Sequence, residues 1–275
     1  MSRRVALIGS PLRRRHSAVM HNAAFRHFGI DARYELLELA ADGVAAFVEG
    51  AREPAWLGFQ VTAPYKRRVS ELVDAVEPET ERIGAVNTVE RRADGSLLGF
   101  NTDAPGWALS VETDLGRTLA GARVAVAGAG GAARAVVMAS LGGGAERVTV
   151  AARRPQAAAE LAEAAGDDRV EPVALGHAFD AVLRETDLAV NATTVGMVDP
   201  GVPFDPAYLS ATAAVFDLVY VPAETELMTR ARSLSLAAVN GMGMLVAQAD
   251  LAFTRWTGRS GAAGVMRTAL EEIAT

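Results

Sequence analysis

Cysteine is absent from the 275-residue sequence. Its absence excludes disulfides, thiolate metal sites and cysteine nucleophiles, and it is consistent with a reducing cytoplasm. An excess of basic charge is also lacking, because the net charge is −6 and the arginine cluster at 13–15 is short. We therefore expect no nucleic-acid partner.

Long apolar runs are lacking as well. The run at the N-terminus ends at Gly9 and Pro11, which makes it too short for the core of a signal peptide, and no other stretch reaches membrane-spanning length. Half of the residues are nevertheless hydrophobic, which is ample for a sizeable core. These features predict a soluble, globular, cytoplasmic protein with no membrane partner.

Short apolar runs alternate with helical patterns in the first third of the chain. The patterns predict strands at 5–9, 34–39 and 58–61 and helices at 17–28 and 42–49. Residues 84–103 differ, because two apolar runs flank the turn signal Ala93-Asp94-Gly95, and they predict a β-hairpin.

A second pattern of alternating strands and helices follows Asp103. Four strand candidates, RVAVAGAGG, RVTVAARRP, DLAVNATT and AAVFDLVY, are spaced to leave room for crossover helices such as 156–166. This pattern predicts a parallel sheet, hence an α/β protein of two domains with a boundary near 103–106. The helices expected at about 241–274 could return to the first domain.

The most specific local signal is VAVAGAGGAARAVV. A strand, Val124–Ala127, leads into a Gly-x-Gly-x-x-Ala turn, and a helical pattern follows from Ala132. The glycines allow a tight turn and a close backbone approach to a pyrophosphate, which the helix N-terminus attracts. We expect the turn to bind a dinucleotide, through Gly128, Ala129, Gly130, Gly131 and Ala132.

The end of the next strand predicts which dinucleotide binds. NAD enzymes tend to carry an acidic residue there, whereas this chain has Arg153 and Arg154 with no acid nearby. Guanidinium groups favour a 2′-phosphate, so the expected cofactor is NADP. The alternative is two ordinary surface arginines at the start of a helix.

In the stretch LGFQVTAPYKRRV, a short predicted strand is followed closely by a cluster of basic residues. Pro64 breaks the strand and is suited to open a helix. Lys66, Arg67 and Arg68 then follow on that turn, either as a solvated face or with one side chain directed into a cleft.

Several stretches together resemble the shikimate dehydrogenase family. They are GSPLRRRHSAVMHN, QVTAPYK, IGAVNTV, GFNTDAPG, VAGAGGAARA, NATTVGM, DLVYVPAETEL and NGMGMLVAQADLAFTRWTG, and they span most of the chain. The resemblance implies an N-terminal α/β substrate domain (1–103, with 241–275 packed back on it), a Rossmann-like NADP domain (104–240) and a cleft between them. It also implies reversible, NADP-dependent reduction of 3-dehydroshikimate to shikimate, an oxidoreductase step of aromatic amino acid biosynthesis by a monomer or homodimer.

The resemblance also implies roles for individual residues. Lys66 and Asp103 match the catalytic pair, and hydride reduction of a ketone does need a proton donor for the alkoxide. Arg67 and Arg68 are then expected to be solvated surface. The substrate-side matches are Ser17, Thr62, Asn87, Asn101, Tyr220 and Gln248, and the further cofactor-side matches are Asn191, Thr193, Met197, Gly241 and Met244.

Two positions depart from the family pattern. Arg15 replaces the first serine of Ser-x-Ser, and Gln60 replaces the asparagine of Asn-Val-Thr. We expect Arg15 to point into the substrate site and pair with a carboxylate. The departures leave open a paralogue that acts on quinate, aminoshikimate or another cyclitol acid, or a non-catalytic ligand-binding module. His16 and His21 lack the spacing and partners of a metal site.

Overall fold

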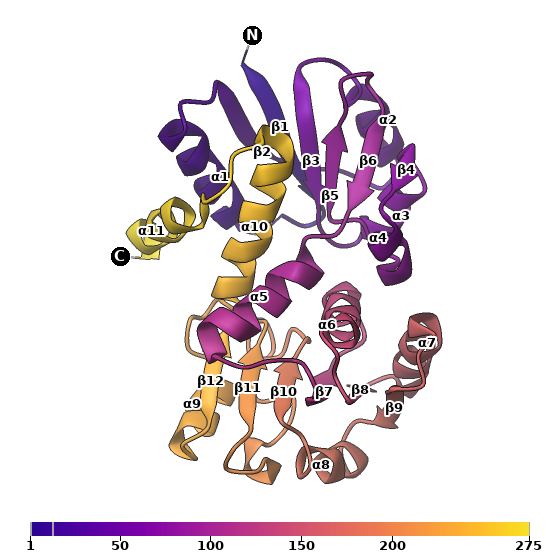
Figure 1. The fold of residues 1–275 in the computed structure, drawn as a ribbon, viewed down its shortest axis with the longest axis vertical. Helices are drawn as coiled ribbons and strands as arrows, with labels where there is room; N and C mark the ends of the chain where they lie inside the picture. Colours follow the sequence, from indigo (N-terminus) through magenta and orange to yellow (C-terminus); the bar gives the residue numbers. More distant parts are fainter. Residues whose placement is uncertain (1, 13, 275) are drawn as a thin grey trace. The chain divides into compact units, whose positions relative to one another are not determined.

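The computed structural model describes residues 2–12 and 14–274, and the chain divides into two compact units. The first unit contains Met1–Thr102 and Val246–Thr275, and the second contains Asp103–Leu245. Figure 1 labels the helices and strands of both.

The first unit is built on a six-stranded mixed sheet of order β2-β1-β3-β5-β6-β4. Its elements are β1 (Arg3–Gly9), α1 (His16–His27), β2 (Ala32–Glu38), α2 (Gly43–Gly50), β3 (Trp56–Val61), α3 (Lys66–Ser70), β4 (Ala75–Val76), α4 (Pro78–Ile83), β5 (Thr88–Arg91) and β6 (Leu97–Phe100), followed at the end of the chain by most of α10 (Met242–Thr257) and by α11 (Ala263–Ala274). β1 pairs with β2 and β3 in parallel, whereas β5 is antiparallel to both β3 and β6. The predicted strands, helices and hairpin are thus confirmed.

The prediction that Pro64 opens a helix was wrong. α3 begins at Lys66 with Tyr65 as its N-cap residue. The Tyr65 N–H donates to the Thr62 carbonyl at 3.1 Å, so Pro64 lies inside a turn that precedes the helix. Lys66 is therefore the first residue of α3.

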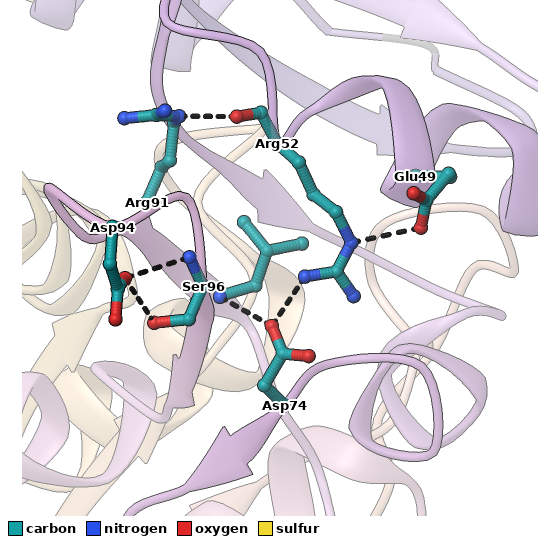
Figure 2. Close-up of polar contacts among 7 residues, drawn as sticks. Glu49, Arg52, Asp74, Arg91, Asp94 and Ser96 are labelled. Atoms are coloured by element: carbon teal, nitrogen blue, oxygen red, sulfur yellow. Dashed lines mark hydrogen bonds and ion pairs between the residues drawn. The ribbon is translucent and has the colours of Figure 1, made fainter.

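An arginine-centred cluster ties the β5–β6 hairpin to its neighbours (Figure 2). Arg52, just after α2, bonds to Glu49 and to Asp74, and the Asp74 carboxylate also accepts the Leu97 N–H at 2.7 Å. Arg91 of β5 donates to the Arg52 carbonyl. Arg52 holds the pKa of Asp74 below its usual value. These contacts fix the hairpin against the end of α2.

A buried histidine lies in an aromatic cluster of the first unit. The His21 ring is fully buried, stacks on Tyr34 with centroids 4.5 Å apart, and lies 5.3 Å from the Trp256 ring. Neither ring nitrogen has a hydrogen-bond partner of good geometry among the described residues. Burial lowers the pKa of His21 to about 3, an effect that the nearby Gln60 partly opposes.

This depressed pKa makes folding stability depend on pH. The neutral ring stabilises the fold fully above its ordinary pKa of 6.5, and that stabilisation is lost as the pH falls from 6.5 towards about 3. At pH 5 the expected loss is about 2 kcal/mol, from 1.5 pH units at about 1.4 kcal/mol each. Denaturant titrations of His21→Leu at several pH values should show a flatter profile. His27→Gln, which changes an exposed histidine of the same helix, should keep the original one. An unchanged profile in His21→Leu would contradict this account.

The second unit contains a six-stranded, fully parallel sheet of order β12-β11-β10-β7-β8-β9. Its elements are α5 (Asp103–Leu115), β7 (Arg123–Ala127), α6 (Gly131–Gly142), β8 (Arg147–Ala152), α7 (Pro155–Ala165), β9 (Val170–Ala174), α8 (His177–Leu183), β10 (Leu188–Asn191), a 3₁₀ turn (Pro206–Tyr208), β11 (Ala214–Asp217), α9 (Glu226–Ser233), β12 (Ala237–Asn240) and the start of α10. When the strands of this unit are numbered in sequence order, their order in the sheet is that of the Rossmann fold. The point at which the strand order reverses lies between β7 and β10.

The four predicted strands of this unit are all present, but the prediction omitted β9 and β12. Both lie at the edges of the sheet. β9 contains Glu171 and Pro172 and is largely exposed, and β12 has only four residues. An exposed edge strand needs no continuous apolar run, so the hydrophobic pattern gave no signal for β9, whereas the short apolar run at 236–239 that leads into β12 was overlooked.

Both faces of this sheet are packed. One core cluster includes Val124, Val126 and Val150, and the other includes Ala125, Ala127 and Ala151, so that side chains of β7 and β8 alternate between the two. The near-continuous apolar strands follow from this two-sided burial.

Candidate functional site

The strands of the second unit bring the predicted cofactor residues to one edge of its sheet. Ala127 is paired with Ala151 on one side and with Asn191 on the other. Since the strands are parallel, the segments that follow β7, β8 and β10 leave the sheet at the same carboxyl edge. Ligands of Rossmann-type sheets bind at this edge, at the switch point.

The glycine turn follows β7 as the sequence predicts. Gly128 has φ of 120°, and a Cβ built on it would lie 2.7 Å from the Ala192 carbonyl oxygen. Only glycine allows this conformation and this close approach. Gly130 is the N-cap residue of α6 and Gly131 its first residue, and both are exposed.

The first turn of α6 has backbone N–H groups that are not capped by the N-cap residue. Gly130, the N-cap residue, has no side chain with which to cap this N-terminus. Ala129 and Ala132 beside it are half-buried and too small to obstruct it. Unsatisfied N–H groups and the helix dipole at such a terminus attract phosphate. The turn therefore fits a pyrophosphate.

Arg153 and Arg154 follow the last residue of β8. Both are exposed, and Arg154 is the N-cap residue of α7. Neither guanidinium makes an ion pair or hydrogen bond to another residue in the part of the chain that the structure describes. Two available guanidinium groups next to the glycine turn are a fitting partner for a 2′-phosphate.

The loop after β10 is organised by Asn191. Its side-chain oxygen accepts from the Thr193 N–H and hydroxyl, and its amide donates to the Asp217 carboxylate at 2.8 Å. Met197, at the end of this loop, is half-buried. The predicted cofactor loop thus has a defined conformation held from the end of β11.

Asp217 is a buried residue that the sequence reasoning missed. Besides Asn191, it accepts from the Val219 N–H at 3.0 Å and the Thr225 hydroxyl at 2.6 Å. Burial raises the pKa of Asp217, and these three donors oppose the rise. The signal was available, since an acidic residue inside the apolar run AAVFDLVY needs partners.

Gly241 and Met244 lie at the same carboxyl edge, after β12. A Cβ on Gly241 would lie 2.3 Å from the Leu218 carbonyl oxygen, so the two backbone segments touch. Met244 is buried in the main core cluster of the unit. Tyr220 is half-buried and follows Val219, whose carbonyl accepts the Gly241 N–H.

The predicted proton donor, Lys66, is half-buried at the start of α3 in the first unit. Arg67 and Arg68 are exposed, and Arg68 pairs with Glu71 at 2.8 Å. The prediction that these arginines are solvated surface is thus confirmed. Asp103 is the first residue of α5 in the second unit, so its pairing with Lys66 stays a prediction.

The two predicted asparagines have structural partners in the first unit. The Asn87 side chain bonds to the Thr102 N–H and to the Thr102 and Thr88 hydroxyls. The Asn101 amide donates to the Ala85 carbonyl at 2.8 Å. These bonds hold the ends of the hairpin together, and a substrate contact by either asparagine stays a prediction.

The other substrate-side candidates of the first unit lie at the start of α1, after β3 and in α10. Arg15 is exposed and Ser17 half-buried at the start of α1, and Thr62 is half-buried after β3. Gln248 is buried in α10 and accepts from the Gln60 amide at 2.8 Å. An inward direction for Arg15 also stays a prediction.

No helix in the described part of the chain is long and apolar enough to cross a membrane. Within residues 2–12 and 14–274, no group of three or more acidic or histidine side chains could hold a metal ion.

Comparison with known proteins decides the family. Three family models match in order: the shikimate dehydrogenase substrate binding domain at 7–89, shikimate / quinate 5-dehydrogenase at 110–197, and the shikimate 5′-dehydrogenase C-terminal domain at 241–271. The chain is 43% identical over 273 residues to a shikimate dehydrogenase (NADP(+)) of Citrifermentans bemidjiense, covering 96% of this chain and 93% of the relative. The chain belongs to the shikimate dehydrogenase family.

Solved structures of the family share the fold. The shikimate 5-dehydrogenase of Thermus thermophilus in complex with NADP(H) and shikimate is 37% identical, with a TM-score of 0.87 over 98% of this chain and 99% of that one. The quinate dehydrogenase of Corynebacterium glutamicum in complex with NAD is 32% identical, with a TM-score of 0.92 and the same coverage. The predicted two-domain α/β architecture with a Rossmann-like second domain is confirmed.

Proposed function

We propose that the protein is an NADP-dependent shikimate dehydrogenase, which reversibly reduces 3-dehydroshikimate to shikimate. The observation that carries the proposal is the carboxyl edge of the second sheet, where the glycine turn lies beside Arg153 and Arg154 in a chain of this family. The relative from Citrifermentans bemidjiense has this activity in its name, which favours shikimate over quinate or another cyclitol acid. A cytoplasmic location fits the absence of cysteine. A monomer or homodimer is part of the same proposal.

The residues of the second unit fit NADP. Backbone N–H groups at Gly130 and Gly131 would hold the pyrophosphate, and Arg153 and Arg154 the 2′-phosphate. Asn191, Thr193, Met197, Gly241 and Met244 would flank the remainder of the cofactor. When bound, NADPH supplies the hydride that reduces the ketone carbon.

Lys66 and Asp103 supply the proton chemistry of the proposal. Reduction of the ketone leaves negative charge on its oxygen, and the Lys66 ammonium donates a proton to that oxygen. Asp103 orients the ammonium group and stabilises its charge until transfer. In the oxidative direction the neutral amine of Lys66 takes the hydroxyl proton.

The polar side chains of the substrate side match a cyclic polyol with a carboxylate. Ser17 and Arg15, at the start of α1, would bind the carboxylate. Thr62, Asn87, Asn101, Tyr220 and Gln248 would bind the ring hydroxyls and the reacting oxygen.

Arg15 gives this assignment a test of its own. If its guanidinium pairs with the carboxylate, Arg15→Ser should raise the KM for shikimate by about tenfold, since a charge-assisted hydrogen bond is lost. Steady-state kinetics with shikimate varied at saturating NADP⁺ measures this. Arg26→Ser, which removes an exposed arginine at the other end of α1, is the matched control. A lower KM in Arg15→Ser would show that Arg15 obstructs the site, and no change would show that it does not meet substrate.

The reaction itself is tested by consumption of NADPH with 3-dehydroshikimate. Rapid loss of NADPH absorbance and formation of shikimate support the proposal. Absence of turnover with this ketone, by a protein that binds NADPH, would overturn it.

A further inference from the structure

A chain of hydrogen bonds crosses the first unit from β2 to α10. The Tyr34 hydroxyl donates to the Gln60 side-chain oxygen at 2.7 Å, and the Gln60 amide donates to the Gln248 side-chain oxygen at 2.8 Å. Tyr34 and Gln60 are each 3% exposed and Gln248 is 7% exposed.

The single hydroxyl proton of Tyr34 fixes the orientation of both glutamine side-chain amides. Because it is donated to Gln60, the carbonyl of that amide faces Tyr34 and its NH₂ group faces Gln248. Gln248 must then turn its own carbonyl to Gln60. The group that Gln248 offers elsewhere is its NH₂, a donor suited to a hydroxyl or ketone oxygen of a cyclic polyol.

We propose that Tyr34 and Gln60 are positioning residues for the substrate side chain Gln248, and that they set Gln248 as a donor to a substrate oxygen. The inference rests on the proposed function, which makes Gln248 a substrate contact. Neither Tyr34 nor Gln60 needs to touch the substrate. Buried side chains joined by hydrogen bonds in this way hold one another in one geometry, and binding groups depend strongly on such support.

The length of Gln60 is part of the arrangement. An asparagine at this position is shorter by one methylene, about 1.5 Å of reach. It could not keep both the 2.7 Å and the 2.8 Å bonds within hydrogen-bonding distance. Gln60→Asn, although it restores the residue usual in the family, is therefore expected to weaken shikimate binding rather than improve it.

Steady-state kinetics on the full-length protein gives the first test. Tyr34→Phe keeps the ring that stacks on His21 and removes only the hydroxyl. We expect it, and Gln60→Asn, to raise the KM for shikimate by about tenfold, the effect of one lost buried hydrogen bond, with kcat less affected. The KM for NADP⁺ should not change, because the cofactor residues belong to the other unit.

A double-mutant cycle separates positioning from a general loss of stability. The loss of kcat/KM caused by Gln248→Ala should be about tenfold smaller in the Tyr34→Phe background, because Gln248 is already misplaced there. Tyr65→Phe is the matched control, since its buried hydroxyl donates instead to the Leu39 carbonyl at 2.7 Å. Its effect should simply multiply with that of Gln248→Ala. If the fold-losses of kcat/KM caused by Tyr34→Phe and Gln248→Ala multiply in the double variant, the inference is overturned.

Side-chain amide NMR provides a readout that requires no turnover. The Gln248 NH₂ resonances, assigned by their loss in Gln248→Ala, should shift in Tyr34→Phe and stay in place in Tyr65→Phe. Unshifted resonances in Tyr34→Phe would overturn the inference. Failure of the unmodified protein to oxidise shikimate would count against the proposed function alone, and the NMR comparison would still decide the role of Tyr34.

Discussion

Lys66→Ala is expected to lower kcat for shikimate oxidation and 3-dehydroshikimate reduction by about 10²–10⁴-fold, the usual contribution of a general acid–base group. Lys66 is the first residue of a short helix, and alanine is a good helix former, so α3 should be retained. NADPH affinity should be nearly unchanged, because the glycine turn and Arg153 belong to the other unit. Steady-state kinetics and NADPH binding, measured on the same preparation, test both expectations.

Arg67→Ala is the matched control for this variant. Arg67 is the next residue of the same helix and is exposed, so its loss should leave kcat unchanged. Asp103→Asn should also reduce kcat strongly, because the ammonium group loses the carboxylate that stabilises it. Near-normal turnover of Lys66→Ala would remove Lys66 from the mechanism.

The second large effect concerns cofactor choice. Replacing Arg153 and Arg154 together by alanine should weaken NADPH binding by about 10–100-fold, since hydrogen bonds between charged groups are lost. NADH binding should change little, because NADH has no 2′-phosphate. Titration of both dinucleotides by protein fluorescence or calorimetry gives the two dissociation constants.

The control for the double variant lies on the same strand. Arg147→Ala removes an exposed arginine at the opposite end of β8, where it pairs with Glu171, and should affect neither dinucleotide. If the double variant weakened NADPH and NADH binding equally, the two arginines would not bind the 2′-phosphate.

Local patterns predicted most of the fold. The strand–turn–helix at Gly128 and the hairpin around Asp94 each depend on glycine and on apolar runs that are contiguous in sequence. The edge strand β9 lacks such a run, and β4 has only two residues. Sequence periodicity reports burial, so elements with little burial gave no signal.

The polar organisation of the candidate site was less accessible to sequence reasoning. Gln60 registers as a departure from a family pattern, but its bonds reach residues 26 and 188 positions away in the chain. Asp217 likewise finds Asn191 26 positions away. The order of the strands in the sheets and the packing of α10 bring these side chains together, and short-range sequence patterns do not contain that information.

The most direct test of the proposed function is a comparison of kcat/KM for four pairs: shikimate or quinate, each with NADP⁺ or NAD⁺. We expect shikimate with NADP⁺ to be the best pair, and both the change of substrate and the change of cofactor to lower kcat/KM. Higher kcat/KM for quinate, or for NAD⁺ with shikimate, would contradict this expectation.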